Sequence, residues 1–330
     1  MEIEKDKILG IDTSNYTTSI AITHKNNQII SDIRAKLVVK PGGRGLRQSE
    51  GVFQHMANMP ALIEQAFSIV AGNELAGIAV SCYPRPIENS YMPVFKVGEN
   101  FGKSLATALN IPLLRFSHQE GHLTASIHGT SLSPERPYLA FHLSGGTSEL
   151  LKMDKKSHDI IGGTKDISFG QLIDRIGVAM NMTFPTGEKM DRLALSYIDS
   201  MESCKKKLTP SFTKIKNHGL WVNLSGLETQ FLRHLKGINA ELSDDEKANF
   251  SFSLFSAIGD CLITLTEESR ETHGIKTILF TGGVSASSFV RKKLAEHFKD
   301  KNMEIHFGNP LLSSDNAVGI ALLGGKTLWP

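Results

Sequence analysis

Two hairpin-like segments, far apart in the sequence, constrain the fold of this chain most strongly. Residues 8–22 and 137–153 each show an apolar strand pattern, a short turn of small polar residues or glycine, and a second strand pattern. Both are followed by further strand and helix patterns, which predicts an internally duplicated α/β architecture. The linker between the two halves is expected within residues 129–136.

Length and composition fit this expectation of two domains. The chain has 330 residues, of which 40% are hydrophobic and 21% charged, and its formal net charge is +2. This charge does not by itself indicate a nucleic-acid binder, and we expect neither DNA nor a membrane as a partner. No apolar run approaches the ~18 residues of a membrane span. Cys82, Cys204 and Cys261 form no C-x-x-C motif, and the N-terminus leaves no room for a signal peptide, so a reduced cytoplasmic protein is predicted.

One short stretch, residues 111–126, combines a buried-strand pattern with a helix start. Ser117 and Glu120 have the spacing of a capping box, so a helix should begin at His118 and place His118 and His122 on one face. Such a pair suits one divalent metal, although two surface histidines meeting by chance would look the same. A zinc protease of the H-E-x-x-H type is disfavoured, because Gln119 stands where its general base would be and Glu120 is interpreted as a cap.

Three turns are candidates for binding a phosphate or a nucleotide, although the first could be just a hairpin, the second a tight turn, and the third does not by itself name its ligand. They are Thr13 to Asn15, Ser144 to Gly146, and Gly282–Gly283 between a strand and a helix. A Gly-Gly turn at the carboxyl end of a strand is a common nucleotide site in open α/β sheets. Near the C-terminus, Asp315 is either the cap of the last helix or a hard oxygen ligand.

A basic stretch without acidic residues lies between the first strands and the first helix. It contains Arg34, Lys36, Lys40, Arg44 and Arg47 and is the best candidate for contact with an anionic partner, although such loops are more often merely solvated.

Six motifs in order resemble one family over nearly the whole chain, the tRNA threonylcarbamoyladenosine synthase family, whose members were formerly called glycoproteases. The motifs are His118–His122 (HQEGH), Leu143–Gly146 (LSGG), Phe184–Gly187 (FPTG), Leu224–Leu227 (LSGL), Gly282–Ala286 (GGVSA) and Ser314–Asn316 (SDN). The resemblance implies the two-lobed fold of actin, the heat-shock ATPases and hexokinase, made of duplicated RNase H-like domains. We expect an N-terminal lobe over residues 1–132 and a C-terminal lobe over 133–330, with the last helix (about 315–328) packing back toward the first lobe.

The resemblance also implies a site and a reaction. A single Fe(II) or Zn(II) would be held by His118, His122 and Asp315. Asp12 and Ser14 are the catalytic candidates. The substrate- or nucleotide-binding candidates are Leu143, Ser144, Gly145, Gly146, Thr147, Asp174, Gly187, Glu188, Gly282, Gly283 and Ser287. The expected activity is that of an acyltransferase in tRNA modification, which moves a threonylcarbamoyl group from an adenylate to an adenosine of tRNA. Partner proteins would supply the adenylate.

Several positions depart from the family pattern, mostly in loops around the transferred group. They are Asn15, Tyr16 and Thr17 in place of a cysteine and two acids, residues 81–86 in place of a glycine-rich loop, and Thr147, Gln171 and Ser287 at single sites. These changes indicate a diverged paralogue. Two alternatives therefore stay open: a carbamoyltransferase that acts on a small molecule, and a non-catalytic subunit that binds adenine nucleotides.

Overall fold

The computed structural model of the chain describes residues 4–14, 16–39, 46–154, 158–204, 212, 214–238, 241–312 and 314–330. It divides into two compact units. Unit 1 comprises residues 1–129 and 311–330, and unit 2 comprises residues 130–310. The chain thus leaves unit 1 once and returns to it for the last helix, so that the C-terminal residues 311–330 belong to the N-terminal unit.

Unit 1 is built on a five-stranded sheet with the order β3-β2-β1-β4-β5. The strands are β1 (Lys7–Asp12), β2 (Thr17–His24), β3 (Ile29–Lys36), β4 (Leu75–Tyr83) and β5 (Leu113–Ser117). The first three form an antiparallel meander, and β4 and β5 then add in parallel to β1. Residues 8–22 thus form the predicted hairpin, with Asp12 paired to Ser19 at its closed end.

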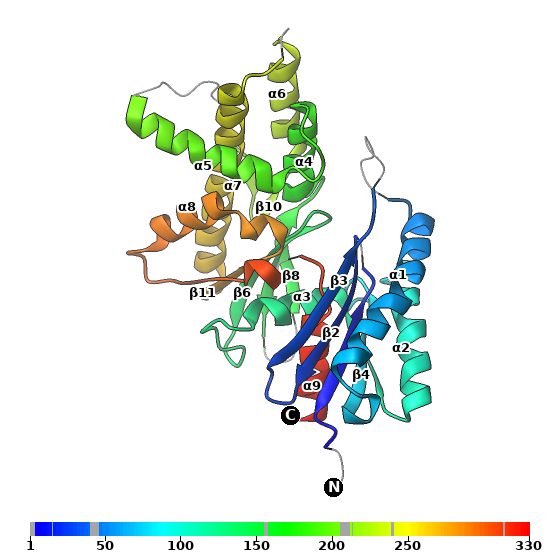
Figure 1. Cartoon of the computed structure of the whole chain (residues 1–330). Helices are drawn as coiled ribbons and strands as arrows, with labels where there is room; N and C mark the ends of the chain where they lie inside the picture. The colour runs from blue at the N-terminus through cyan, green and yellow to red at the C-terminus, as the bar shows by residue number, and fades with distance from the viewer. Residues whose placement is uncertain are drawn as a thin grey trace. The chain divides into compact units, whose positions relative to one another are not determined.

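The two faces of this sheet carry different side chains and different helices. Leu9, Ile11 and Ile20 point into a core shared with α1 (Gln48–Ile69) and α2 (Phe95–Leu109). The alternate positions carry small residues such as Gly10, and on this side α9 (Val318–Leu328) packs so closely that a Cβ on Gly10 would lie 2.6 Å from a backbone oxygen of Ala317. Figure 1 shows α1 and α2 on one side of the blue strands and the red α9 on the other. The strand alternation therefore sets where the C-terminal helix can lie.

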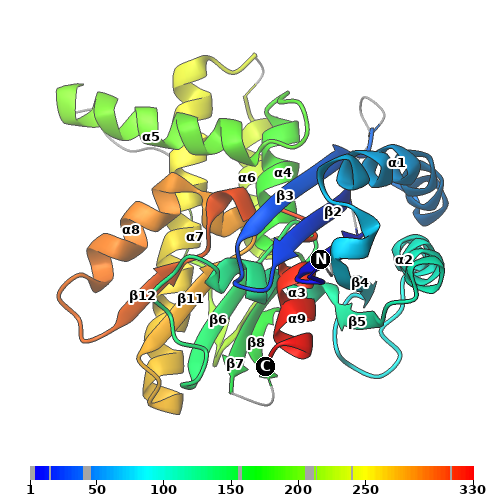
Figure 2. The same ribbon diagram turned by 60° about the horizontal axis from the view of Figure 1, so that its bottom comes forward.

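Unit 2 repeats the same strand pattern. Its sheet has the order β12-β11-β6-β7-β8-β10-β9, in which β6 takes the place of β1, and β11 and β12 take those of β4 and β5. The strands are β6 (Tyr138–Leu143), β7 (Ser148–Met153), β8 (His158–Thr164), β9 (Asn217–His218), β10 (Trp221–Val222), β11 (Thr277–Thr281) and β12 (Glu304–Phe307). β6 to β8 form an antiparallel meander, and β11 and β12 add in parallel to β6. This correspondence of the two strand orders confirms the predicted duplication. Figure 2 shows β12, β11 and β6 side by side in the sheet of unit 2.

Helices of unit 2 bury one face of this sheet. They are α4 (Phe169–Ala179), α5 (Gly187–Cys204), α6 (Ser225–Lys236), α7 (Asp244–His273) and α8 (Ser288–Phe298). The described residues also form α3 (His118–Ile127) and the short 3-10 turns η1 (Gly72–Glu74), η2 (Gly283–Ala286) and η3 (Pro310–Leu312). Phe141 and Phe280 of neighbouring strands stack at 5.0 Å and share a core with Phe255 of α7.

Among the described residues, α7 is the one helix long and apolar enough to cross a membrane, a candidate that the sequence analysis did not expect. However, 56% of its most apolar window is buried inside the structure, and Leu254, Ile258 and Leu262 are fully buried in the unit 2 core. Its apolar character is therefore accounted for by core packing.

Candidate functional site

The helix that carries the two histidines starts where the sequence predicts. The Ser117 hydroxyl accepts a hydrogen bond from the amide of Glu120 (3.2 Å), and the Glu120 carboxylate accepts one from the amide of Ser117 (2.7 Å). This capping box fixes the first residue of α3 as His118 and contributes about 1 kcal/mol to the helix. It also confirms Glu120 as a cap, since its carboxylate folds back onto Ser117.

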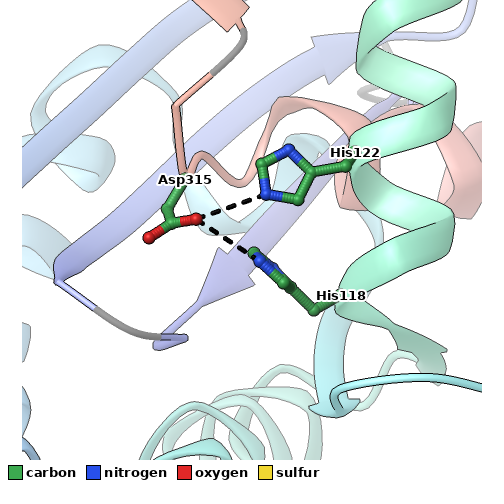
Figure 3. Close-up of side chains that lie close together, drawn as sticks. All are labelled: His118, His122 and Asp315. Carbon is green, nitrogen blue, oxygen red and sulfur yellow. Dashed lines mark hydrogen bonds and ion pairs between the residues drawn. The ribbon is translucent and has the colours of Figure 1, made fainter. Parts of the chain in front are cut away.

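Asp315 meets both imidazoles within unit 1. The rings of His118 and His122 lie 4.3 Å apart between centroids. The Asp315 carboxylate oxygen Oδ1 lies 3.4 Å from His118 Nε2 and 3.2 Å from His122 Nε2 (Figure 3). One ligand atom from each of the three residues falls within 4.8 Å of the others. Two imidazole nitrogens and one carboxylate oxygen, brought together in a largely buried place, form a donor set that suits Zn(II) or Fe(II) better than Mg(II).

Asp12 fixes the orientation of His118. Its Oδ2 lies 2.9 Å from His118 Nδ1, so the opposite ring nitrogen, Nε2, is directed at Asp315. Asp12 is itself held by the Ser81 hydroxyl (2.6 Å) and by the amide and hydroxyl of Ser14 (2.9 and 3.0 Å). Asp12 and Ser14, the catalytic candidates, are 1% and 0% exposed. Their observed contacts are those of residues that position a histidine.

The electrostatics of this cluster favour a positive charge. Burial alone would lower the pKa of His118, but the carboxylates of Asp12 and Asp315 raise it to about 10. Burial likewise acts to raise the pKa of each carboxyl, yet the adjacent histidines hold both pKa values below the ordinary range. The two carboxylates that flank His118 therefore favour a positive charge at this point, which either a proton on the imidazole or a metal cation can supply.

Hydrogen bonds to residues before and after Asp315 hold the loop that carries it. The Asn316 side chain donates to the carbonyls of Leu312 (2.8 Å) and Ser314 (2.7 Å) and accepts from the amide of Val318 (3.0 Å). Asn316 thus takes part in capping α9, while the Asp315 carboxylate turns toward the histidines. The structure therefore gives the cap contact of α9 to Asn316, and directs the Asp315 carboxylate at the two imidazoles. The hydroxyl of Ser19 on β2 also accepts from the amide of Ala317 (2.9 Å).

A glycine contact between α3 and α9 brings the two ligand-bearing segments together. A Cβ on Gly319 would lie 1.8 Å from the backbone oxygen of Gly121, and a Cβ on Gly121 would lie 2.8 Å from Ile320. Gly121 is next to His122, and Gly319 lies four residues after Asp315, in the first turn of α9. The spacing between imidazoles and carboxylate therefore depends on two residues without side chains.

The predicted nucleotide-binding turns lie together in unit 2, at the carboxyl ends of the parallel neighbours β6 and β11. Gly282 has φ +90°, and a Cβ there would lie 2.5 Å from the backbone oxygen of Leu143, so the double-glycine turn touches the end of β6. In the other turn the Ser144 hydroxyl already accepts from the amides of Gly146 (3.2 Å) and Thr147 (2.9 Å). Gly145 and Gly283 have open space where a side chain would be.

The other candidates in unit 2 have partners within the protein. Asp174 Oδ1 accepts from the amide of Thr186 (2.8 Å), and burial raises the pKa of Asp174. Glu188 follows Gly187 in the first turn of α5; it is highly exposed and pairs with Arg192 at 2.8 Å.

Ser287 is the N-cap of α8 and is engaged by a residue that the sequence analysis missed. Its hydroxyl donates to Asp191 Oδ1 (2.5 Å) and accepts from the amide of Val290 (3.1 Å). Asp191 also accepts from the amides of Ser288 (2.9 Å) and Phe289 (3.1 Å). Asp191 lies inside a helix, 96 positions from Ser287, where no local pattern signals a cap.

The basic residues divide into three groups. Lys36, at the end of β3, and Arg47, just before α1, are exposed. Arg34 is engaged by Asp32 and by the segment before α9. Lys40 and Arg44 lie outside the described residues, as does Asn15 of the first turn.

Comparison with solved structures identifies the class of fold. HypF from T. kodakarensis is similar with a TM-score of 0.62 and 14% identity, covering 99% of this chain and 48% of that one. Component A of the (R)-2-hydroxyglutaryl-CoA dehydratase of Acidaminococcus fermentans gives a TM-score of 0.56 and 15% identity, covering 98% of each chain. With the doubled strand order, these similarities define an α/β protein of the actin, heat-shock ATPase and hexokinase class, made of two RNase H-like units.

Comparison of sequences then identifies the family. The profile of the family described as tRNA N6-adenosine threonylcarbamoyltransferase matches residues 34–322. Proteins of this name from Chlorobium phaeovibrioides and Geobacter metallireducens are 28% and 27% identical, over 96% of this chain and 92% and 90% of theirs. The chain belongs to the tRNA N6-adenosine threonylcarbamoyltransferase family.

Proposed function

We propose that this protein is a metal-dependent acyltransferase of tRNA modification, which transfers a threonylcarbamoyl group from its adenylate to the N6 amine of an adenosine in tRNA. The observation that carries the proposal is the convergence of His118, His122 and Asp315 on one point, in a chain that belongs to this family. The amine nitrogen would form a bond to the carbamoyl carbon, the bond from that carbon to the adenylate oxygen would break, and AMP and one proton would leave.

In this proposal His118, His122 and Asp315 hold Fe(II) or Zn(II), and Asp12 keeps His118 in the ligand orientation. When bound there, such a metal supplies Lewis acidity toward the phosphate and carbonyl oxygens of the acyl-adenylate. Because the buried Asp12 carboxylate engages Nδ1 of His118, only Nε2 can serve as the metal ligand. The same carboxylate raises the basicity of Nε2. We therefore assign Asp12, and Ser14 and Ser81 that hold it, a positioning role.

The adenylate would lie against unit 2. The turns at residues 143–146 and 282–283 meet at the ends of β6 and β11, where parallel sheets bind nucleotides. Gly145 and Gly283 leave space for close approach by a phosphate or a base. The Asp174 carboxylate, fixed by Thr186 next to Gly187, would contact the ribose hydroxyls. Thr147 and Glu188 remain binding candidates, whereas we now assign the Ser287 hydroxyl to the cap of α8.

The proposed partners are tRNA, with Lys36, Lys40, Arg44 and Arg47 as its contacts, and proteins that supply the adenylate. We place this activity in a reducing cytoplasm, which fits the two buried free thiols, Cys82 and Cys261. Burial raises the pKa of both thiols to about 12, so they stay protonated and unreactive.

The experiment that tests this function is deletion of the gene followed by mass spectrometry of the modified nucleosides of total tRNA. We expect the threonylcarbamoylated adenosine to fall in the deletion strain, to return with the parent gene, and to stay low with His122→Ala. If another tRNA-modifying enzyme covers the same position, purified protein with its adenylate-supplying partners should still modify unmodified tRNA. A normal nucleoside profile together with inactive purified protein would contradict the proposal. Accumulation of a carbamoylated or uncarbamoylated metabolite would then indicate a small-molecule acceptor.

A further inference from the structure

Arg34 connects the edge strand β3 to the segment that precedes Asp315. Its Nη1 donates to the Ser314 hydroxyl at 2.9 Å, and its Nη2 donates to the backbone oxygen of Leu311 at 3.0 Å. These contacts span 280 and 277 positions of sequence and lie within unit 1. Arg34 therefore holds the residue immediately before the aspartate, as well as the start of the segment that returns to unit 1.

The guanidinium is itself oriented by Asp32, two positions earlier on the same strand. Arg34 Nε donates to Asp32 Oδ1 at 2.8 Å, and Nη2 forms a second contact with the same carboxylate. The planar guanidinium presents several donors in a fixed arrangement, so it can engage a carboxylate and two further acceptors at once. A lysine ammonium is a single point charge at the end of a flexible chain and would not hold the same three partners in place.

The position of Asp315 depends on such external contacts because residues 314–317, the part of the segment between η3 and α9 that the structure describes, lie in no helix or strand. Asn316 and Ser19 fix the side that leads into α9. Arg34 fixes the opposite side, through Leu311 and Ser314. A shift of Ser314 would move the adjacent Asp315 carboxylate relative to imidazoles that are anchored independently on α3.

We propose that Arg34 is a positioning residue for the Asp315 ligand, and not one of the contacts with an anionic partner for which the basic stretch was the candidate. The Asp32–Arg34 pair on β3 holds Leu311 and Ser314 in place, so that Asp315 reaches both histidines. This inference rests on the metal centre of the proposed function and adds to it a contact from a third part of the chain.

The test compares Arg34→Met with Lys36→Met in the full-length protein. Lys36 lies two positions further along β3, is exposed, and belongs to the same predicted basic stretch. Zn(II) affinity is measured by competition with a chromophoric chelator, without tRNA or nucleotide, and thermal unfolding is measured in the metal-free state. We expect Arg34→Met to weaken Zn(II) binding about tenfold, the usual size of the loss of a supporting contact around a ligand, and Lys36→Met to leave it unchanged.

Two further variants keep the test decisive. Arg34→Lys keeps the charge but should bind Zn(II) nearly as weakly as Arg34→Met. Ser314→Ala removes the surface hydroxyl that accepts from Arg34 Nη1. It should weaken Zn(II) binding about threefold, as expected for the loss of one hydrogen bond. This variant provides a test even if Arg34→Met fails to fold.

The outcomes separate this inference from the function on which it rests. If the parent protein binds no Zn(II) or Fe(II), the metal centre itself is refuted and the inference with it. If the parent binds Zn(II) and Arg34→Met and Ser314→Ala bind it equally well, only the role of Arg34 is refuted. Lower tRNA affinity with a smaller salt slope for Arg34→Met, at unchanged Zn(II) affinity, would instead make Arg34 a phosphate contact.

Discussion

His118 is held at both ring nitrogens, and this arrangement distinguishes it from an ordinary buried histidine. Asp12 contacts Nδ1 and Asp315 lies near Nε2, so the ring is held in one orientation with Nε2 directed at a carboxylate. A positive charge at Nε2 is favoured there. It can be a proton, as the raised pKa of His118 indicates, or a bound metal.

Removing a ligand should abolish metal uptake. His122→Ala deletes one imidazole but leaves the Asp12–His118 pair intact, so the fold should survive and the metal content should fall to background. The measurement is elemental analysis of purified protein after incubation with Zn(II) or Fe(II) and gel filtration. His24→Ala, which changes a histidine paired with Asp6 elsewhere in unit 1, should keep the parent's metal content. Equal occupancy in His122→Ala and the parent would remove His122 from the site.

Removing the orienting carboxylate should weaken the metal without abolishing it. Asp12→Asn keeps the shape of the side chain but loses the charge that fixes the His118 ring, and Zn(II) affinity should fall about 10- to 100-fold. Chelator competition measures this change. Asp174→Asn, in unit 2, alters another buried aspartate and should leave Zn(II) affinity unchanged. A full loss of binding would make Asp12 itself a ligand, and no change would leave it without a role at the metal.

The geometry of the site depends on how closely helix α3 approaches helix α9. Gly121 and Gly319 let the two helix backbones touch, and Gly10 lets α9 lie close against the sheet. Helices of ordinary composition keep interaxial distances of about 8–10 Å, and a side chain at this contact would separate the segments that carry the ligands.

Gly319→Ala tests this contact. The new Cβ would meet the Gly121 oxygen, so we expect a loss of about 1–3 kcal/mol of unfolding free energy and weaker Zn(II) binding. Urea unfolding and chelator competition measure the two effects. Gly226→Ala, in α6 of unit 2, places a Cβ in open space and should leave both values nearly unchanged or slightly raise stability. A Gly319→Ala protein with the parent's stability would show that the helices can separate at little cost.

In the molecule as a whole, the metal ligands belong to one unit although 193 sequence positions separate His122 from Asp315. Residues 311–330 complete unit 1 after the chain has formed all of unit 2. A metal bound to His118, His122 and Asp315 would therefore connect the body of unit 1 to its returning C-terminal segment, and should stabilise unit 1 in particular.

Chelation should thus lower the unfolding temperature of the metal-loaded protein. At a free metal concentration 100 times Kd, binding contributes about 2.7 kcal/mol, enough to shift the transition by several degrees. Differential scanning calorimetry with and without a strong chelator measures the shift, and added Zn(II) should reverse it. The unfolding of His122→Ala should be insensitive to chelator. If two transitions are resolved, the one that responds to chelator should belong to unit 1.

Local features of this protein were predictable from the sequence because each depends on a few neighbouring residues. The Ser117–Glu120 capping box, the helix start at His118 and the two strand–turn–strand hairpins all appear as expected. The ends of helices are harder to predict: residues 250–268 carry the pattern of a long amphipathic helix, whereas α7 extends over Asp244–His273. The capping box of Ser243 and Glu246 starts it earlier than its apolar pattern suggests.

Contacts between distant parts of the chain were decided by the tertiary structure. The sequence alone indicated a histidine pair suited to a metal, a duplicated α/β fold and a separate aspartate with two alternative roles. Only the packed structure directs Asp315 at the histidines, places Asn316 at the start of α9, and engages Arg34 and Asp191 with residues 280 and 96 positions away. The physical reason is that periodicity and capping act within a few residues, whereas these partners meet only after burial has brought separate elements together.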